Sequence, residues 1–76
     1  MIERPEALPR GTRVRMKADG REGYVYLRGG NWTFSANRWV GNYNYVFCRE
    51  EQPEDFDETQ PPEGCFDIHD QMVELV

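Results

Sequence analysis

The stretch Tyr24–Arg49, YVYLRGGNWTFSANRWVGNYNYVFCR, decides the fold class of this 76-residue chain. It contains eight of the ten aromatic residues, including both tryptophans. Gly29-Gly30-Asn31 and Gly41-Asn42 divide it into short runs. Short runs of β-branched and aromatic residues, separated by residues that tolerate a positive φ, are typical of a meander of strands. The stretch therefore predicts an all-β fold with turns at these two places.

The longest strand in this meander is expected at residues 43–49. Because successive side chains of a strand point to opposite faces, Val46 and Cys48 share one face and Tyr45 lies on the other. We expect the face with Val46 to be in the core and the aromatic face to be partly exposed. A further strand is expected at residues 12–17, where apolar and cationic residues alternate. The side chains predicted to be buried are Val14, Val25, Leu27, Val46, Ile68, Val73 and Leu75.

The charge is distributed very unevenly along the chain, although the formal net charge is only −5. Residues 1–49 carry all nine Lys and Arg against four acids, hence +5, whereas residues 50–76 carry ten acids and no cation, hence −10. Such asymmetry indicates an electrostatic role toward nucleic acid or a charged protein surface. Under the simpler interpretation, the acidic part only keeps the protein soluble or pairs with its own basic strands.

The length and the absence of long apolar runs limit the possible functions. A single domain of this size buries a small core, so a deep substrate cavity is not expected. No run of about 18 apolar residues is present, and the charged start Met1–Pro5 does not resemble a signal peptide. We therefore expect a cytoplasmic monomer without membrane contact. The expected organisation is an extended arm at 1–9, a barrel built from 10–49 and 64–76, and an acidic loop at 50–63.

The order of these pieces resembles an SH3-like small β-barrel of about five strands, with a long acidic loop before the last strand. The resemblance rests on Arg10–Arg15 (RGTRVR), Glu22–Val25 (EGYV), Tyr45–Phe47 (YVF), Phe66–Ile68 (FDI) and Met72–Val76 (MVELV). Similar frames occur in KOW-type and Tudor-like modules and in the small SH3-like peripheral subunit of photosystem I. The chain departs from KOW-type modules in its acidic insertion and from Tudor-like modules in lacking an acid-plus-aromatic cage. The resemblance implies a binding module.

Two groups of residues are candidates for binding a partner. The acidic loop could imitate a row of phosphates and dock on a basic groove, while cations beside flat rings suit single-stranded nucleic acid, because rings stack on bases. The candidates in the acidic loop are Glu50, Glu51, Glu54, Asp55, Asp57 and Glu58. The candidates on the basic and aromatic face are Arg13, Arg15, Lys17, Tyr24, Tyr26, Arg28, Trp32, Arg38 and Trp39.

Cysteine and histidine placement gives no sign of a catalytic or metal site. Cys48 and Cys65 would close a 17-residue loop as a disulfide, but without a secretion signal we expect two reduced thiols. His69 adds a third residue type that binds zinc, yet no pair has CxxC spacing. No nucleophile and base stand at a diagnostic spacing, and phosphate-binding glycine motifs are absent. We expect no enzyme activity, metal or cofactor.

The expected function is that of a small regulatory or accessory protein, with a possible role in transcription regulation. It would dock on a larger protein with a basic groove, of the kind that handles nucleic acid. The first alternative is direct binding of single-stranded RNA or DNA through the basic and aromatic face. The second, suggested only by the resemblance, is a structural accessory subunit of a redox or photosynthetic complex.

Overall fold

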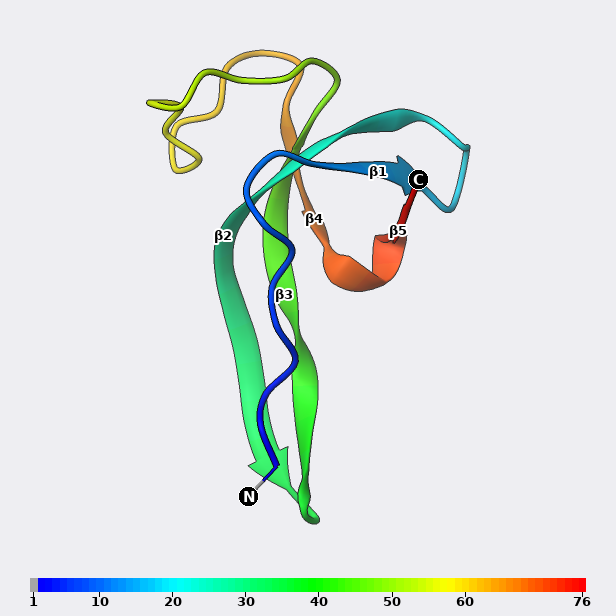
Figure 1. The fold of residues 1–76 in the computed structure, drawn as a ribbon, viewed down its shortest axis with the longest axis vertical. Coiled ribbons are helices and arrows are strands. Elements are labelled where there is room, and N and C mark those ends of the chain that lie inside the picture. The colour runs from blue at the N-terminus through cyan, green and yellow to red at the C-terminus, as the bar shows by residue number, and fades with distance from the viewer. Residues whose placement is uncertain (1) are drawn as a thin grey trace.

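The computed structural model describes residues 2–76, which form one open antiparallel sheet of five strands in the order β4-β3-β2-β1-β5 (Figure 1). In chain order the elements are β1 (Thr12–Met16), β2 (Glu22–Ser35), β3 (Arg38–Cys48), β4 (Phe66–His69), the 3-10 helix η1 (Asp70–Met72) and β5 (Val73–Leu75). The predicted all-β class is confirmed. The sheet is not closed, because its two edge strands, β4 and β5, do not pair with each other.

A long hairpin of β2 and β3 dominates the structure and extends well beyond the other strands (Figure 1). Pairing runs from Tyr24 opposite Cys48 to Ser35 opposite Arg38. The predicted turns at 29–31 and 41–42 are wrong, since both glycine segments lie inside the paired strands. The chain instead reverses at Ala36 and Asn37, which both have positive φ, 52° and 64°. Two consecutive residues with positive φ are what a type I′ hairpin turn requires.

Gly41 lies inside β3, at a position where a side chain would collide with the neighbouring strand. Its φ is 151°, and a Cβ added at this position would overlap the backbone carbonyl of Asn31 on β2. The glycine therefore serves a close approach between the paired strands, not a turn. We call the part of the hairpin that projects beyond the sheet, residues 29–43, the stem.

The main core lies on one face of the sheet, where β1, β2, β3, β4 and β5 all contribute side chains. Its buried members are Val14, Met16, Val25, Tyr45, Phe47, Ile68 and Val73. Leu27 is only half-buried at its edge, and Leu75 is 62% exposed, so the prediction of a buried Leu75 is wrong. Leu75 lies in a three-residue edge strand that has a partner on one side only.

A second, smaller cluster covers the opposite face of the same sheet. Tyr26, Val46 and Cys48 are buried there, with Phe56 from the acidic segment packed against them. Both faces of the end of β3 are therefore buried, and the prediction that the side with Tyr45 is partly exposed is wrong. An alternation of apolar and polar residues predicts only one buried face of a strand. The pattern therefore did not reveal that the acidic segment covers the other face of β3.

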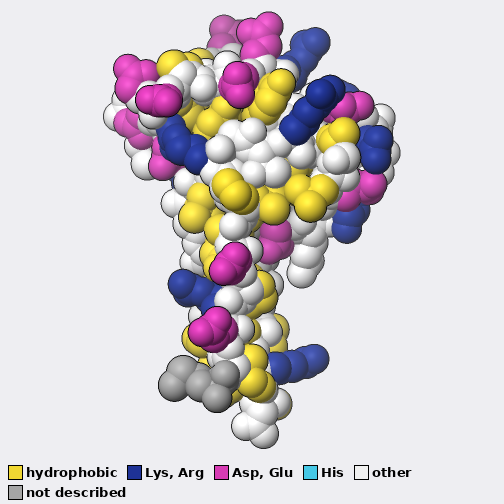
Figure 2. Space-filling view, viewed as in Figure 1, with side chains coloured by type: hydrophobic (Ala, Val, Ile, Leu, Met, Phe, Trp, Pro, Cys, Tyr) yellow, Lys and Arg dark blue, Asp and Glu magenta, His cyan; other side chains and the backbone are white. Residues whose placement is uncertain are grey.

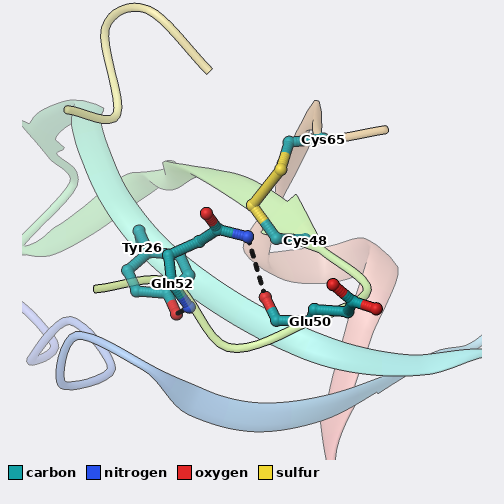
Figure 3. Close-up of a disulfide and its surroundings, with 5 residues drawn as sticks. All are labelled: Tyr26, Cys48, Glu50, Gln52 and Cys65. Atoms are coloured by element: carbon teal, nitrogen blue, oxygen red, sulfur yellow. Dashed lines mark hydrogen bonds between the residues drawn. A yellow bond between two sulfur atoms is a disulfide. The ribbon is translucent and has the colours of Figure 1, made fainter. Parts of the chain in front are cut away.

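A disulfide lies at the second cluster. Cys48 at the end of β3 and Cys65 just before β4 form a disulfide (Figure 3). The prediction of two reduced thiols is therefore corrected. The bond ties together the two ends of the acidic segment that lies between these residues.

The N-terminal arm lies outside the strands and follows the stem in Figure 1. Met1, part of the predicted arm, lies outside the described residues. The arm ends in a turn before β1, where the Thr12 N–H donates to the carbonyl of Pro9 at 3.1 Å. Within residues 2–76, no helix has the length and apolar character needed to cross a bilayer.

Candidate docking surface

Residues 50–64 form a compact lobe of successive turns, which we call the acidic lobe. The Phe56 N–H donates to the carbonyl of Pro53 at 3.0 Å, and the Gln60 N–H donates to the carbonyl of Asp57 at 3.1 Å. In Figure 2 several acidic side chains gather at the upper left, where Figure 1 places this lobe. The segment is therefore not extended, although repulsion among its carboxylates favours an extended chain. The lobe is folded back on the sheet.

Apolar contacts hold the lobe on the second face of the sheet. The rings of Phe56 and Tyr26 meet edge to face, with centroids 4.9 Å apart. Tyr26 is 2% exposed, so its predicted place on a solvent-facing aromatic surface is wrong. Its hydroxyl accepts a hydrogen bond of 2.7 Å from the backbone N–H of Gln52, whose side chain in turn donates to the Glu50 carbonyl at 3.0 Å (Figure 3).

Arg10 supplies the polar anchor of the lobe. Its guanidinium donates to the Glu58 carboxylate at 2.9 Å and to the backbone carbonyl of Phe56 at 2.5 Å. The same group lies over the Tyr26 ring, 5.3 Å from its centroid. One cation from the turn before β1 thus fixes the lobe through charge, backbone and ring contacts together.

Six of the seven carboxylates in the lobe have no cationic partner among residues 2–76. The exception is Glu58, and the hydrogen bond from Arg10 lowers the pKa of its carboxyl. Asp57 accepts from both the hydroxyl and the N–H of Thr59, at 2.6 and 2.9 Å, and these bonds lower its pKa as well. The carboxylates without a cationic partner are Glu50, Glu51, Glu54, Asp55, Asp57 and Glu63.

Two hollows flank the lobe, and each has two of these carboxylates in its wall. Glu51 and Glu54 line one hollow of about 480 Å³, which Arg10 and Tyr26 also border. The other, of about 290 Å³, has Glu50 and Glu63 in its wall together with Arg49. A side chain with a cationic head and an apolar stem suits the hollow with Glu51 and Glu54, because its wall offers both carboxylates and a ring.

The predicted basic face is largely paired with the chain's own acids. The ion pairs are Arg13–Glu22 at 2.8 Å, Arg15–Glu74 at 3.4 Å and Arg28–Asp67 at 2.7 Å. Among the described residues Lys17 and Arg38 have no carboxylate partner. These exposed ion pairs are weak, so each arginine could bind a phosphate in place of its own carboxylate. The displaced carboxylate would then lie beside the phosphate and repel it.

The predicted aromatic residues do not form one surface either. A bulge between Leu27 and Gly29 shifts the register of β2 against β3. The shift changes which residues of β2 share a face, because side chains alternate along a strand. Tyr24 and Tyr26 consequently lie on the side of the acidic lobe, whereas Trp32 and Trp39 lie on the opposite side of the hairpin, each half-buried.

Neither of the two residues that hold the lobe is among the binding candidates predicted from the sequence. Phe56 is the only aromatic residue in the acidic segment, and this isolation indicates an apolar anchor. Arg10 precedes a glycine in a turn and carried no signal of its long-range contact. Across the described residues, no cluster of three His, Cys, Asp or Glu side chains could hold a metal ion.

Comparison with protein-family models, with curated proteins and with solved structures finds no match for this chain. We therefore infer function from the geometry of the chain itself.

Proposed function

We propose that this chain is a non-enzymatic docking protein that binds a basic groove on a larger protein through the acidic lobe. The observation that carries the proposal is that the lobe is anchored on the sheet while six of its carboxylates have no cationic partner among the described residues. An anchored row of anions loses little conformational freedom on binding, so more of the attraction is available for affinity. Complementary charge also raises the association rate.

The partner chemistry follows from the two hollows. Each offers a pair of carboxylates to a Lys or Arg side chain, and the hollow with Glu51 and Glu54 adds the edge of an aromatic cluster. Grooves lined with Lys and Arg are typical of proteins that handle nucleic acid, since such grooves follow the phosphate backbone. The proposed partner is therefore a protein of this kind, with an accessory or regulatory role for the chain described here.

A defined cationic probe tests the proposal without knowledge of the natural partner. A labelled decalysine peptide is titrated with the protein over a series of salt concentrations, followed by fluorescence anisotropy. The variant Glu51→Gln with Glu54→Gln reduces the net charge from −5 to −3, and we expect it to weaken binding about three- to tenfold at low salt and to flatten the salt dependence.

A matched control separates the lobe from net charge alone. Glu3→Gln with Glu6→Gln makes the same change of net charge on the exposed N-terminal arm. We expect this control to bind the probe as the wild type does. Equal weakening by the two variants would mean that only net charge matters, and no weakening by either would remove the lobe from the interaction.

The alternatives have less support. Direct binding of single-stranded nucleic acid would use arginines that are paired with the chain's own acids, and a labelled oligonucleotide in the same titration tests it. No specific contact favours the accessory subunit of a redox or photosynthetic complex, which stays a prediction.

The finer description of the fold is also a proposal, namely an SH3-like barrel that is open between its edge strands. It is supported by the pairing of β1 with both β2 and β5, and by the three-residue η1 that joins the edge strands β4 and β5. An experimental structure in which β5 leaves β1 would overturn it.

The monomeric state and the cytoplasmic location stay predictions. The disulfide counts against the cytoplasm, because reducing compartments keep most thiols reduced. Alkylation of the cysteines in intact cells tests the location, since an oxidised pair is protected from the reagent.

A further inference from the structure

A hollow of about 460 Å³ lies where the stem meets the rest of the sheet. Its wall comes from three neighbouring strands, with β3 between β2 and β4 (Figure 1). Asn44 of β3 lies opposite Gly29 on β2 and opposite His69 on β4. Because side chains alternate along a strand, Asn44 shares a face with Val46 of the second cluster. The hollow therefore lies on the face opposite the main core.

A β-bulge places a cation at the edge of this hollow. Leu27 and Gly29 each lie opposite a residue of β3, whereas Arg28 between them does not. A bulge commonly turns a side chain into a new direction, and Arg28 reaches across β3 to Asp67 on β4. Gly29 leaves the adjacent space open, since no heavy atom lies within 4 Å of the place that its Cβ would occupy.

The ion pair of Arg28 and Asp67 has unused hydrogen-bonding capacity on both sides. Only Nη1 of the guanidinium donates to the carboxylate, at 2.7 Å to each oxygen. Within residues 2–76, Nε and Nη2 of Arg28 form no hydrogen bond, and the Asp67 carboxylate accepts from no other group. The two side chains remain 39% and 62% exposed, so a ligand in the hollow can reach both of them.

The rest of the wall adds a donor without adding charge. The side-chain amide of Asn42 donates to Oδ1 of Asn44 at 3.1 Å, so the NH₂ group of Asn44 remains as a donor. With His69 counted as neutral at pH 7, Arg28 and Asp67 are the only charged side chains among the described residues that line the hollow. The hollow therefore presents one positive and one negative group side by side and has no net charge.

We propose that this hollow is a binding site for a free α-amino acid. The carboxylate of the ligand accepts hydrogen bonds from Nε and Nη2 of Arg28 and from the amide of Asn44, and its ammonium group donates to Asp67. In an α-amino acid both charged groups are bonded to one carbon atom, so they are as close together as the charges of the ion pair. Opposite charges then alternate around the site, and the ion pair need not break.

Ligands with a single charge fit the hollow less well. A phosphate or a simple carboxylate would lie beside Asp67 and would also be repelled by the net charge of −5 of the whole chain. A simple cation would lie beside Arg28. A zwitterion avoids both costs, because it is neutral as a whole and meets each charge with the opposite one. No residue of the acidic lobe lines the hollow, so the proposal does not depend on the proposed function.

The first test compares three ligands that differ only in charge, using the full oxidised protein. L-alanine, N-acetyl-L-alanine and L-alaninamide are titrated, and binding is followed by NMR at the backbone amide of Gly29 and the side-chain amide of Asn44. We expect a saturable shift with L-alanine and binding about tenfold weaker or less for either analogue, since each has lost one charged hydrogen-bonding group. Equal binding by one analogue would overturn the proposal in favour of a simple anion or cation site. So would no saturable shift with any common α-amino acid at about 50 mM.

A substitution in the ion pair tests which group of the ligand each residue binds. Asp67→Asn removes the partner of the ammonium group, so it should weaken binding of L-alanine about tenfold and abolish its preference over N-acetyl-L-alanine. Glu22→Gln makes the same change of charge in the exposed ion pair with Arg13 and is the matched control. It should leave both affinities unchanged. A merely structural role of Asp67 would not alter the preference between the two ligands.

A substitution that fills the hollow tests the place of binding. Gly29→Val puts a side chain into the open space beside Gly29 and should abolish binding of L-alanine. Thr33→Val, an exposed change on the same strand beyond the hollow, should not affect it. The urea midpoint of each variant shows whether the fold is intact. Wild-type affinity in both Gly29→Val and Asp67→Asn would overturn the proposal, because the amino acid would then bind elsewhere.

Discussion

Replacing Val46 by Ala tests whether the acidic lobe really covers the second face of the sheet. Val46 is 0% exposed and lies beside Tyr26 in the cluster against which Phe56 of the lobe packs, while Val40, in the same strand, is 48% exposed on the stem. The same chemical change can therefore be made at a buried and at a half-exposed position. Only the contacts of the two valines differ.

The magnitude follows from the atoms removed. Each substitution deletes about two methylene equivalents, worth about 0.8 kcal/mol each when they are fully buried. At Val46 a cavity is left as well, so the free energy of unfolding should fall by about 2–3 kcal/mol. At Val40 the removed methyl groups are only about half buried and no cavity forms, so the free energy of unfolding should fall by less than about 1 kcal/mol.

Urea unfolding of the oxidised protein, followed by tryptophan fluorescence, measures both losses. Parallel curves with unchanged slopes are needed for the comparison, since a changed slope would mean a different extent of unfolding. Equal losses for Val46→Ala and Val40→Ala would refute the reasoning, because Val46 would then have no cover from the lobe.

Three further predictions concern the disulfide, the stem and the lobe. Reduction by dithiothreitol should lower the free energy of unfolding by about 3 kcal/mol, as the chain-entropy model gives for this loop, and an unchanged urea midpoint would contradict it. Gly41→Ala should cost more than about 2 kcal/mol because of its φ and the overlap with β2, whereas Gly29→Ala, with open space around its Cβ, should change the midpoint little. Thr59→Val removes the hydroxyl that lowers the pKa of Asp57, so an NMR titration should show that pKa rising toward its ordinary value. The stabilisation from Asp57 in the wild type is present above the ordinary carboxyl pKa and is lost as the pH falls through the lowered value.

Local patterns in the sequence predict the parts of the fold where one face meets the core. The alternation around Val14 and Met16 gives β1 and its buried side, and Pro9 and Gly11 are residues typical of the turn that precedes this strand. These features depend only on neighbours along the chain. They can therefore be deduced from the sequence alone.

The long hairpin could not be deduced in this way. Glycine pairs usually mark turns, but at Gly41 the constraint is a close approach of the opposite strand, which no local pattern reveals. The true turn contains Ala36, a residue that seldom adopts positive φ, so it gave no turn signal. The bulge after Leu27 added a second error, because it reversed which aromatic side chains share a face.

The sequence predicts the negative charge of the candidate site but not how the acidic segment folds. The acidic residues are clustered in the sequence itself, so their role as a surface could be expected. Their anchoring depends on Arg10 and on the contact of Phe56 with Tyr26, and these residues are 46 and 30 positions from Phe56. Only the folded chain brings them together.

The most direct test of this account is the contact between Phe56 and Tyr26 in solution. Their ring centroids are 4.9 Å apart, so nuclear Overhauser effects between the two rings should be strong in the oxidised wild-type protein. Such effects would place the acidic lobe on the sheet as an anchored surface. Their absence, together with narrow random-coil amide resonances across residues 50–64, would contradict the central claim and leave the segment a solubilising loop.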